Sequence, residues 1–154
     1  MALLLRPSML DDLGLVPALE WQGREVSRQG QMEVDVHAAN IPEDLPDDYR
    51  ICIYRVVQEA LNNAARHATA RSAKVDLSLQ AEQIIVSISD DGRGFDSSRT
   101  RGLGLLGMEE RVRRLGGKLT IHSQSGQGTH IRVELPLPFS NVIKRHEETS
   151  HTAR

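Results

Sequence analysis

The chain has 154 residues, of which 39% are hydrophobic and 26% are charged, with a formal net charge of −2 at pH 7. This length suits one globular domain with a single core and short appendages. The small net charge gives no reason to expect nucleic acid or an anionic membrane surface as the main partner. Cys52 is the only cysteine, which excludes an internal disulfide and suits a reducing compartment. We therefore expect a cytoplasmic domain.

The hydrophobic pattern of the N-terminal half predicts a helix, a strand and a longer helix. Apolar residues recur at helical spacing over residues 10–28, with a break or start near Pro17. Residues 32–37 alternate between apolar and polar, as in a half-buried strand. An acidic loop with two prolines covers residues 40–48, and its last aspartates can cap a helix that extends to about Ala68.

The next part of the chain predicts a hairpin, a loop and a further helix. Two alternating segments, residues 75–79 and 84–88, are separated by a short polar turn. A loop rich in Gly, Ser and Arg follows over residues 90–104. Residues 105–115 return to a helical pattern that ends at Gly116, a common C-terminal stop.

Two short strands close the predicted domain. Apolar residues at 119–121 and 131–135 flank a turn at 125–128, and beyond Pro138 the chain is polar and without periodicity. We expect residues 139–154 to form a flexible tail. The elements together predict a protein of the α/β class, a two-layer α/β sandwich whose mixed sheet of about five strands is covered on one face by helices.

The longer predicted helix has a polar face that suggests a site. Residues three and four apart are neighbours on a helix, and this face holds Arg55, Glu59, Asn62, Asn63 and Arg66. Adjacent asparagines are poor helix formers, so their presence in mid-helix needs a reason. One reason is Mg²⁺, which prefers oxygen ligands and takes a few protein oxygens together with phosphate oxygens. The alternative is a solvated polar face.

A second motif follows the strand at residues 84–88. Asp90 lies at the strand end, where a carboxylate can accept a hydrogen bond from an exocyclic amine, and Gly92 and Gly94 allow the backbone to approach a flat ring. A simple turn is the alternative, because Asp-Gly is a common turn pair.

A third motif comprises Gly102, Gly104 and Gly107. It matches the dinucleotide fingerprint in spacing, but that fingerprint should close the first strand of a β-α-β unit, and here the glycines come late. A fourth motif, Gly126 to Thr129, either belongs to the same pocket or forms a hairpin turn.

In order and spacing these motifs resemble the ATP-binding catalytic domain of sensor histidine kinases, within the gyrase/Hsp90/histidine kinase/MutL ATPase superfamily. The resemblance covers residues 49 to about 136 and implies a Bergerat-type ATP-binding fold. It implies that Asn63 binds Mg²⁺ and that Glu59 polarises a water or the attacking group, which makes these two the catalytic residues. It also implies that Asp90 contacts the adenine amino group. The residues implied to bind the nucleotide are Asn63, Arg66, His67, Asp90, Gly92, Gly94, Gly102, Leu103, Gly104, Leu105, Gly107 and Thr129.

Two further segments resemble the subfamily that pairs with NarL-type response regulators. They are Leu105 to Arg111, and Leu5-Arg6-Pro7 together with Leu10 to Leu15. In that subfamily the Leu-Arg-Pro segment ends the dimerisation hairpin. The implied division of the chain is a remnant of the hairpin or linker helix at 1–30, the ATP-binding catalytic domain at 31–138, and the tail.

The resemblance implies an enzyme that binds Mg-ATP and donates the γ-phosphoryl group to a histidine on a dimerisation domain outside this chain, with a response regulator as indirect partner. None of the six histidines lies in the expected acceptor context. We therefore expect a catalytic fragment, monomeric in isolation, of a homodimeric parent. The main alternative is a free-standing serine kinase or ATP-dependent switch of the anti-sigma-factor type. A gyrase- or MutL-type ATPase, which needs a downstream domain, and a degenerate ATP-binding module are further alternatives.

Overall fold

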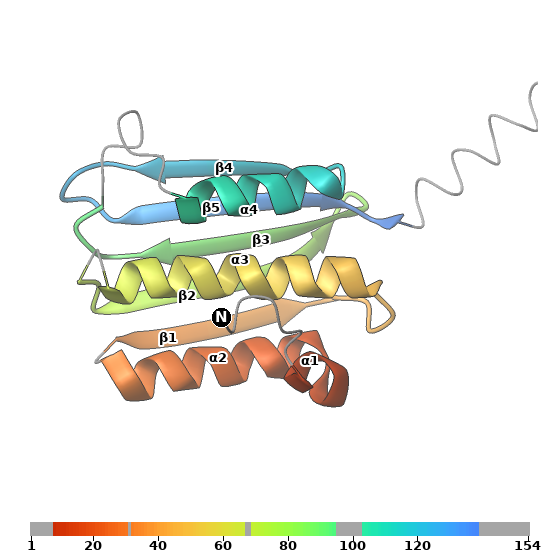
Figure 1. Cartoon of the computed structure of the whole chain (residues 1–154), viewed down its shortest axis with the longest axis horizontal. Helices are drawn as coiled ribbons and strands as arrows, with labels where there is room; N and C mark the ends of the chain where they lie inside the picture. The colour runs from red at the N-terminus through yellow and green to blue at the C-terminus, as the bar shows by residue number, and fades with distance from the viewer. Residues whose placement is uncertain (1–7, 31, 67–68, 95–102, 139–154) are drawn as a thin grey trace, which may run out of the picture.

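The computed structural model describes residues 8–30, 32–66, 69–94 and 103–138. These residues form one sheet of five strands with the helices on its near side in Figure 1. The elements are α1 (Ser8–Leu13), α2 (Leu15–Gly30), β1 (Glu33–Ala39), α3 (Asp47–Arg66), β2 (Ser72–Gln80), β3 (Gln83–Asp90), α4 (Leu103–Arg114), β4 (Lys118–Ser123) and β5 (Thr129–Pro136). The predicted two-layer α/β sandwich is confirmed.

The sheet is mixed, with strand order β1-β2-β3-β5-β4. β1 and β2 are parallel and the other neighbours are antiparallel. Parallel neighbours need a long crossover, which α3 supplies between β1 and β2. β2 and β3 form the predicted hairpin, whose two turn residues, Ala81 and Glu82, have φ of 50° and 62°. This left-handed geometry fits a two-residue hairpin turn, although neither residue is the Gly or Asn that such turns favour.

The core lies between the sheet and α3, as the alternating pattern predicts. Along β3, Ile84, Val86 and Ile88 are buried towards the helices, because successive strand residues point to opposite faces. The matching stripe on α3 includes Ile53 and Leu61, which are also buried. Such burial contributes about 1.5–3 kcal/mol for each large aliphatic side chain.

The first helical region forms two helices, and the predicted start near Pro17 agrees with α2, which begins at Leu15. The shorter helix α1 precedes it, and the break between the two is at Gly14, with φ of +86°. Gly14 adopts the left-handed conformation that ends many helices. Pro17 lies in the first turn of α2, where its missing N–H would have no intrahelical acceptor. Ala18 and Leu19 of α2 are fully buried in the same core as α3.

The last helix is longer than predicted at its start and ends as predicted. α4 begins at Leu103 rather than Leu105. At its end Gly116 has φ of +75°, and the N–H of Gly117 donates to the carbonyl of Val112 at 3.0 Å. This is the glycine-based termination that the sequence indicates.

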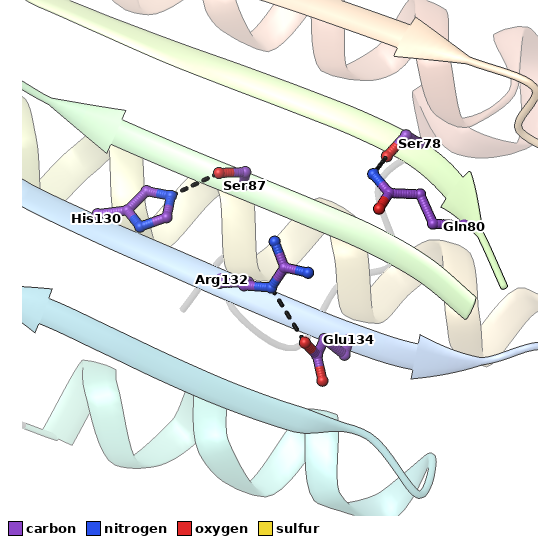
Figure 2. Close-up of polar contacts among 6 residues, drawn as sticks. All are labelled: Ser78, Gln80, Ser87, His130, Arg132 and Glu134. Atoms are coloured by element: carbon purple, nitrogen blue, oxygen red, sulfur yellow. Dashed lines mark hydrogen bonds and ion pairs between the residues drawn. The ribbon is translucent and has the colours of Figure 1, made fainter.

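Apart from the buried Ile85, the face of the sheet away from the helices is largely polar. Figure 2 shows three contacts on it: Ser87 with His130 at 2.6 Å, Arg132 with Glu134 at 3.1 Å, and Gln80 with Ser78. Because these side chains are exposed or half-buried and pair with one another, this face is a solvated surface rather than a second core.

Two predicted segments fall outside the described residues: the flexible tail at 139–154, and residues 95–102 of the loop rich in Gly, Ser and Arg. Within the described part of the chain, no helix has the length and apolar character needed to cross a bilayer.

Candidate functional site

The sequence motifs meet at one end of the sandwich, although up to 70 residues separate them. The C-terminal end of α3, the ends of β3 and β4, and the starts of β5 and α4 all lie on the left in Figure 1. Asp90 pairs with Thr129 across β3 and β5, and Thr129 pairs with Ser123 across β5 and β4. These three residues therefore form one row across the strand ends.

The Asp90 carboxylate is half-buried and held by backbone groups. Its Oδ1 accepts the N–H of Gly92 at 2.8 Å, and the N–H of Thr129 also bonds to the carboxyl group. Burial raises the pKa of Asp90 above its ordinary value, and the charge of Asp91 adds to this, while the two N–H groups oppose it. A desolvated carboxylate held in this way is suited to accept a hydrogen bond from a ligand.

Asp91, which the sequence analysis left out, fixes the loop that carries Asp90. Its Oδ1 accepts the N–H groups of Arg71 at 2.8 Å and Ser72 at 3.0 Å, and its Oδ2 accepts the Ser72 hydroxyl at 2.9 Å. Hydrogen bonds from Ser72 and Arg71 lower the pKa of Asp91. The loop after β3 is thereby tied to the start of β2. No sequence signal marks this role, because the partners lie 19 and 20 residues away.

The glycines at this end allow two backbone segments to touch. Gly94 has φ of +64°, and a Cβ there would lie 2.2 Å from the carbonyl oxygen of Gln124. Gly128 has φ of +78°, and a Cβ there would lie 2.2 Å from the carbonyl oxygen of Asp90. The N–H of Gly126 donates to the carbonyl of Arg93. The loop after β3 therefore packs directly on the β4–β5 turn.

The polar face of α3 points towards the start of α4. Glu59 and Asn63 are half-buried, one helical turn apart, whereas Asn62 and Arg66 are exposed. A Cβ on Gly104 would lie 2.0 Å from Oε1 of Glu59, so the Glu59 side chain occupies the space that this glycine leaves. His67 and Gly102 lie outside the described residues.

The first turns of α4 bring the third motif to this place. Leu103 begins the helix, Leu105 is half-buried against the core, and Gly107 would meet nothing within 4 Å if it carried a Cβ. The first four N–H groups of a helix have no intrahelical acceptor and carry partial positive charge, which favours an anion.

The oxygen atoms at this end of the sandwich offer a hard cation a few ligands but not a complete set. Within the described part of the chain, no group of three His, Cys, Asp or Glu side chains is arranged to hold a metal ion. The half-buried Asn63 carboxamide is a neutral oxygen donor beside Glu59. This set fits Mg²⁺, which keeps several waters and takes phosphate oxygens.

The strand ends line a hollow of about 500 Å³, within the range of small-molecule sites. Its ten lining residues come from β3, β4, β5 and the turn, and they include Asp90, Ser123 and Thr129. Ser123 is only 7% exposed, and its Oγ lies 2.8 Å from Thr129 Oγ1 and 3.2 Å from the carbonyl oxygen of Gly128. Ser123 could not be recognised as a site residue from the sequence, because only the strand register places it beside Thr129.

Comparisons with known proteins agree with this arrangement. Residues 48–139 match the family model described as histidine kinase-, DNA gyrase B-, and HSP90-like ATPase. The chain is 38% identical over 136 residues to the oxygen sensor histidine kinase NreB of Staphylococcus carnosus, covering 86% of this chain and 39% of that protein. It is 35% identical over 140 residues to the signal transduction histidine-protein kinase/phosphatase DegS of Bacillus subtilis, covering 86% and 36%. The chain thus spans less than half the length of these relatives.

A solved structure gives the same result. The histidine kinase domain of the blue-light activated histidine kinase EL346 of Erythrobacter litoralis superposes with a TM-score of 0.62 at 28% identity, over 78% of this chain and 61% of that one. The family model covers more than half of the chain, and its matched range contains the Asn63, Asp90 and Gly104 motifs. This chain therefore belongs to the histidine kinase-, DNA gyrase B- and HSP90-like ATPase family.

Proposed function

We propose that this chain is the catalytic domain of a two-component sensor histidine kinase, which binds Mg-ATP and donates the γ-phosphoryl group to a histidine outside the chain. The observation that carries the proposal is the half-buried Asp90 carboxylate, held beside Thr129 at the same end of the sandwich as the start of α4. The names of the relatives support a histidine rather than a serine as acceptor.

Adenine recognition is assigned to the strand ends. Asp90 accepts a hydrogen bond from the adenine amino group, since its carboxylate is half-buried and already oriented by the Gly92 N–H. Gly92 and Gly94 bring the loop backbone close to the base, and Thr129 is one of the residues that line the hollow. A buried charged acceptor selects strongly for a ligand that supplies the matching donor.

Phosphate recognition is assigned to α4 and to the end of α3. The unpaired N–H groups of the first turn of α4, Leu103 to Leu106, including those of Gly104 and Leu105, are assigned to the phosphates. Gly102 and Gly107 complete the proposed phosphate-binding residues. Arg66 and His67 add positive charge. Asn63 would hold Mg²⁺, which neutralises phosphate charge when bound.

Catalysis in this scheme is mainly positioning. The attacking imidazole nitrogen of the acceptor displaces ADP from the γ-phosphorus, and Glu59 polarises the attacking group through its half-buried carboxylate. Phosphoryl transfer needs little covalent chemistry from the protein beyond alignment and charge neutralisation.

The partners follow from the proposed reaction. They are ATP, the dimerisation and phosphoacceptor domain of a homodimeric parent, and indirectly a response regulator. α1 and α2 would continue from the dimerisation hairpin. We place the chain in the cytoplasm, where ATP is supplied, with a parent that can be anchored in the inner membrane.

Calorimetric titration with a non-hydrolysable ATP analogue, with and without Mg²⁺, tests the pocket, and GTP is the control ligand. Asp90→Ala removes a hydrogen bond to a charged group, so we expect a loss of roughly tenfold or more in affinity. Asn63→Ala should lose the Mg²⁺ dependence, whereas Asn62→Ala, its exposed neighbour, should behave like the parent chain. Equal behaviour of the Asn62 and Asn63 variants would contradict the Mg²⁺ assignment.

A second experiment tests the acceptor. The chain is incubated with γ-labelled Mg-ATP and the separately produced dimerisation domain of the parent protein. Acid-labile label on a histidine of that domain is the expected result. Label on a histidine of this chain alone, or acid-stable label on a serine, would refute the proposed reaction.

A further inference from the structure

Two histidines, His122 and His130, lie directly opposite each other on the outer face of the sheet. They are register partners on the antiparallel strands β4 and β5. Their neighbours Ile121 and Ile131 belong to the core under the helices, and successive strand residues point to opposite faces. Both imidazoles therefore lie on the face away from the helices. Both also line the hollow at the strand ends, which leaves open space beside them.

The spacing of such a pair suits one metal ion. Side chains directly opposite on antiparallel strands have Cβ atoms about 4.5–5.5 Å apart. A metal ion binds imidazole nitrogens at about 2.0–2.1 Å, so two nitrogens on the same ion lie about 3 Å apart. Two imidazoles can reach this separation by rotation about their side-chain bonds, without movement of the strands. His122 is exposed and free to adjust its ring, whereas His130 is half-buried.

Ser87 on β3 holds the His130 ring in an orientation that suits a ligand. Figure 2 shows the ring directed towards Ser87, whose Oγ lies 2.6 Å from Nε2. A neutral imidazole carries one N–H. When that hydrogen is on Nε2, it donates to the Ser87 hydroxyl, and the lone pair of Nδ1 is available to a metal. Metal-binding histidines usually donate their other ring N–H in this way, which fixes the tautomer and the ring orientation.

The neighbouring groups leave the pair accessible but do not complete a full ligand set. Arg132, the next outward residue on β5, is paired with Glu134 at 3.1 Å, which offsets its charge. Among the residues that the structure describes, no third His, Cys, Asp or Glu joins the two histidines, so water would fill the remaining positions. Cys52 is buried, and burial raises the pKa of its thiol to about 11, so this thiol does not compete for the ion.

We propose that His122 and His130 form a two-histidine site for Cu²⁺, Ni²⁺ or Zn²⁺, with Ser87 as a positioning residue for His130. Imidazole nitrogen suits these ions, whereas Mg²⁺ prefers oxygen ligands. The site is distinct from Asn63, the proposed Mg²⁺ ligand, because Asn63 is on α3 and the helices cover the other face of the sheet. Cu²⁺ should bind most tightly of the three ions, since it stands highest in the usual order of affinity.

Calorimetric titration of the intact chain with Cu²⁺, in excess Mg²⁺, tests the site. His122→Ala and His130→Ala should each weaken binding by more than about tenfold, and Ser87→Ala should weaken it about tenfold. Ser87→Thr keeps the hydroxyl group and should bind like the parent chain. The matched control is His37→Ala, because His37 is an exposed histidine on β1 and should not contribute.

Electron paramagnetic resonance of the Cu²⁺ complex counts the coordinated imidazoles independently of affinity. Two are expected in the parent chain and one in each of the His122 and His130 variants, and urea unfolding confirms that these surface variants remain folded. One imidazole in the parent chain would overturn the proposal, as would an equal loss of affinity in the His37, His122 and His130 variants. Unchanged binding by Ser87→Ala would refute the role of Ser87.

Discussion

The β4–β5 turn contains two glycines that separate backbone strain from a steric contact. Gly126 has φ of +84° and Gly128 has φ of +78°, so alanine is strained at both positions. Placing an L side chain in this region costs about 1–2 kcal/mol. A Cβ at Gly126 would meet nothing within 4 Å, whereas one at Gly128 would lie 2.2 Å from the carbonyl oxygen of Asp90.

The contact at Gly128 sets the size of the difference. A carbon and a carbonyl oxygen approach to about 3.3 Å at closest, so the end of β3 or the turn must move by about 1 Å. Forcing an extra methyl group into a packed site costs about 1–3 kcal/mol. Gly126→Ala should therefore lower the free energy of unfolding by about 1–2 kcal/mol, and Gly128→Ala by about 2–5 kcal/mol.

Urea unfolding of both variants measures this difference, and titration with the ATP analogue measures its effect on the site. Gly128→Ala displaces Asp90 and should weaken binding, while Gly126→Ala should bind like the parent chain. Equal losses of stability in the two variants would refute the steric argument and leave backbone strain as the whole cost. Unchanged binding by Gly128→Ala would show that the position of Asp90 is not set by this contact.

Four further predictions follow from individual side chains. Burial raises the pKa of Asp90, so the ionised carboxylate lowers the free energy of unfolding at neutral pH, and this cost disappears below the pKa. Asp90→Asn should therefore stabilise the chain at pH 7. Urea unfolding at several pH values should show that this gain in stability becomes smaller as the pH falls. Asp91→Ala should cost about 1–2 kcal/mol in the same assay, since it removes three solvent-exposed hydrogen bonds, and Asp91→Asn, whose amide oxygen still accepts from the backbone, should recover most of it. Glu82→Gly should raise the free energy of unfolding by about 0.5–1 kcal/mol, because φ of 62° there is strained. Gly107→Ala should raise the free energy of unfolding by about 0.5–1 kcal/mol, because alanine has the higher helix propensity. The same variant should bind the ATP analogue more weakly in calorimetry.

The layers of the fold could be predicted from the sequence because they depend on local periodicity. The alternation around Ile84 to Ile88 and the stripe on α3 report burial directly, and both are confirmed. The predicted start of a helix near Pro17 agrees with α2, because the first turn of a helix accepts proline without losing a hydrogen bond. The separate helix α1 and the break at Gly14 could not be predicted, because the apolar spacing continues across Gly14.

The site was predicted less completely, for a reason that lies in register. Asp90 and the glycines form contiguous motifs, whereas Ser123 and Asp91 acquire their roles only from partners on other strands. Pairing register depends on how the whole sheet assembles, and a shift of one residue would turn Ser123 to the opposite face. Nothing in the neighbouring sequence distinguishes Ser123 from the exposed Ser125.

The glycines of the nucleotide motifs do not all support the same conclusion. Gly94 and Gly128 are required by backbone contacts within the protein, so their presence is explained without any ligand. The atom nearest to a Cβ on Gly104 is the end of the flexible Glu59 side chain, which can move away, so this contact favours glycine less strictly. Gly107 differs, because a Cβ there would meet nothing within 4 Å and glycine is a poor helix former. Within the described part of the chain no contact accounts for it. A phosphate group that approaches the helix at this point would explain why residue 107 is a glycine. Gly107 therefore supports nucleotide binding more directly than the glycines that are in contact with other parts of the protein.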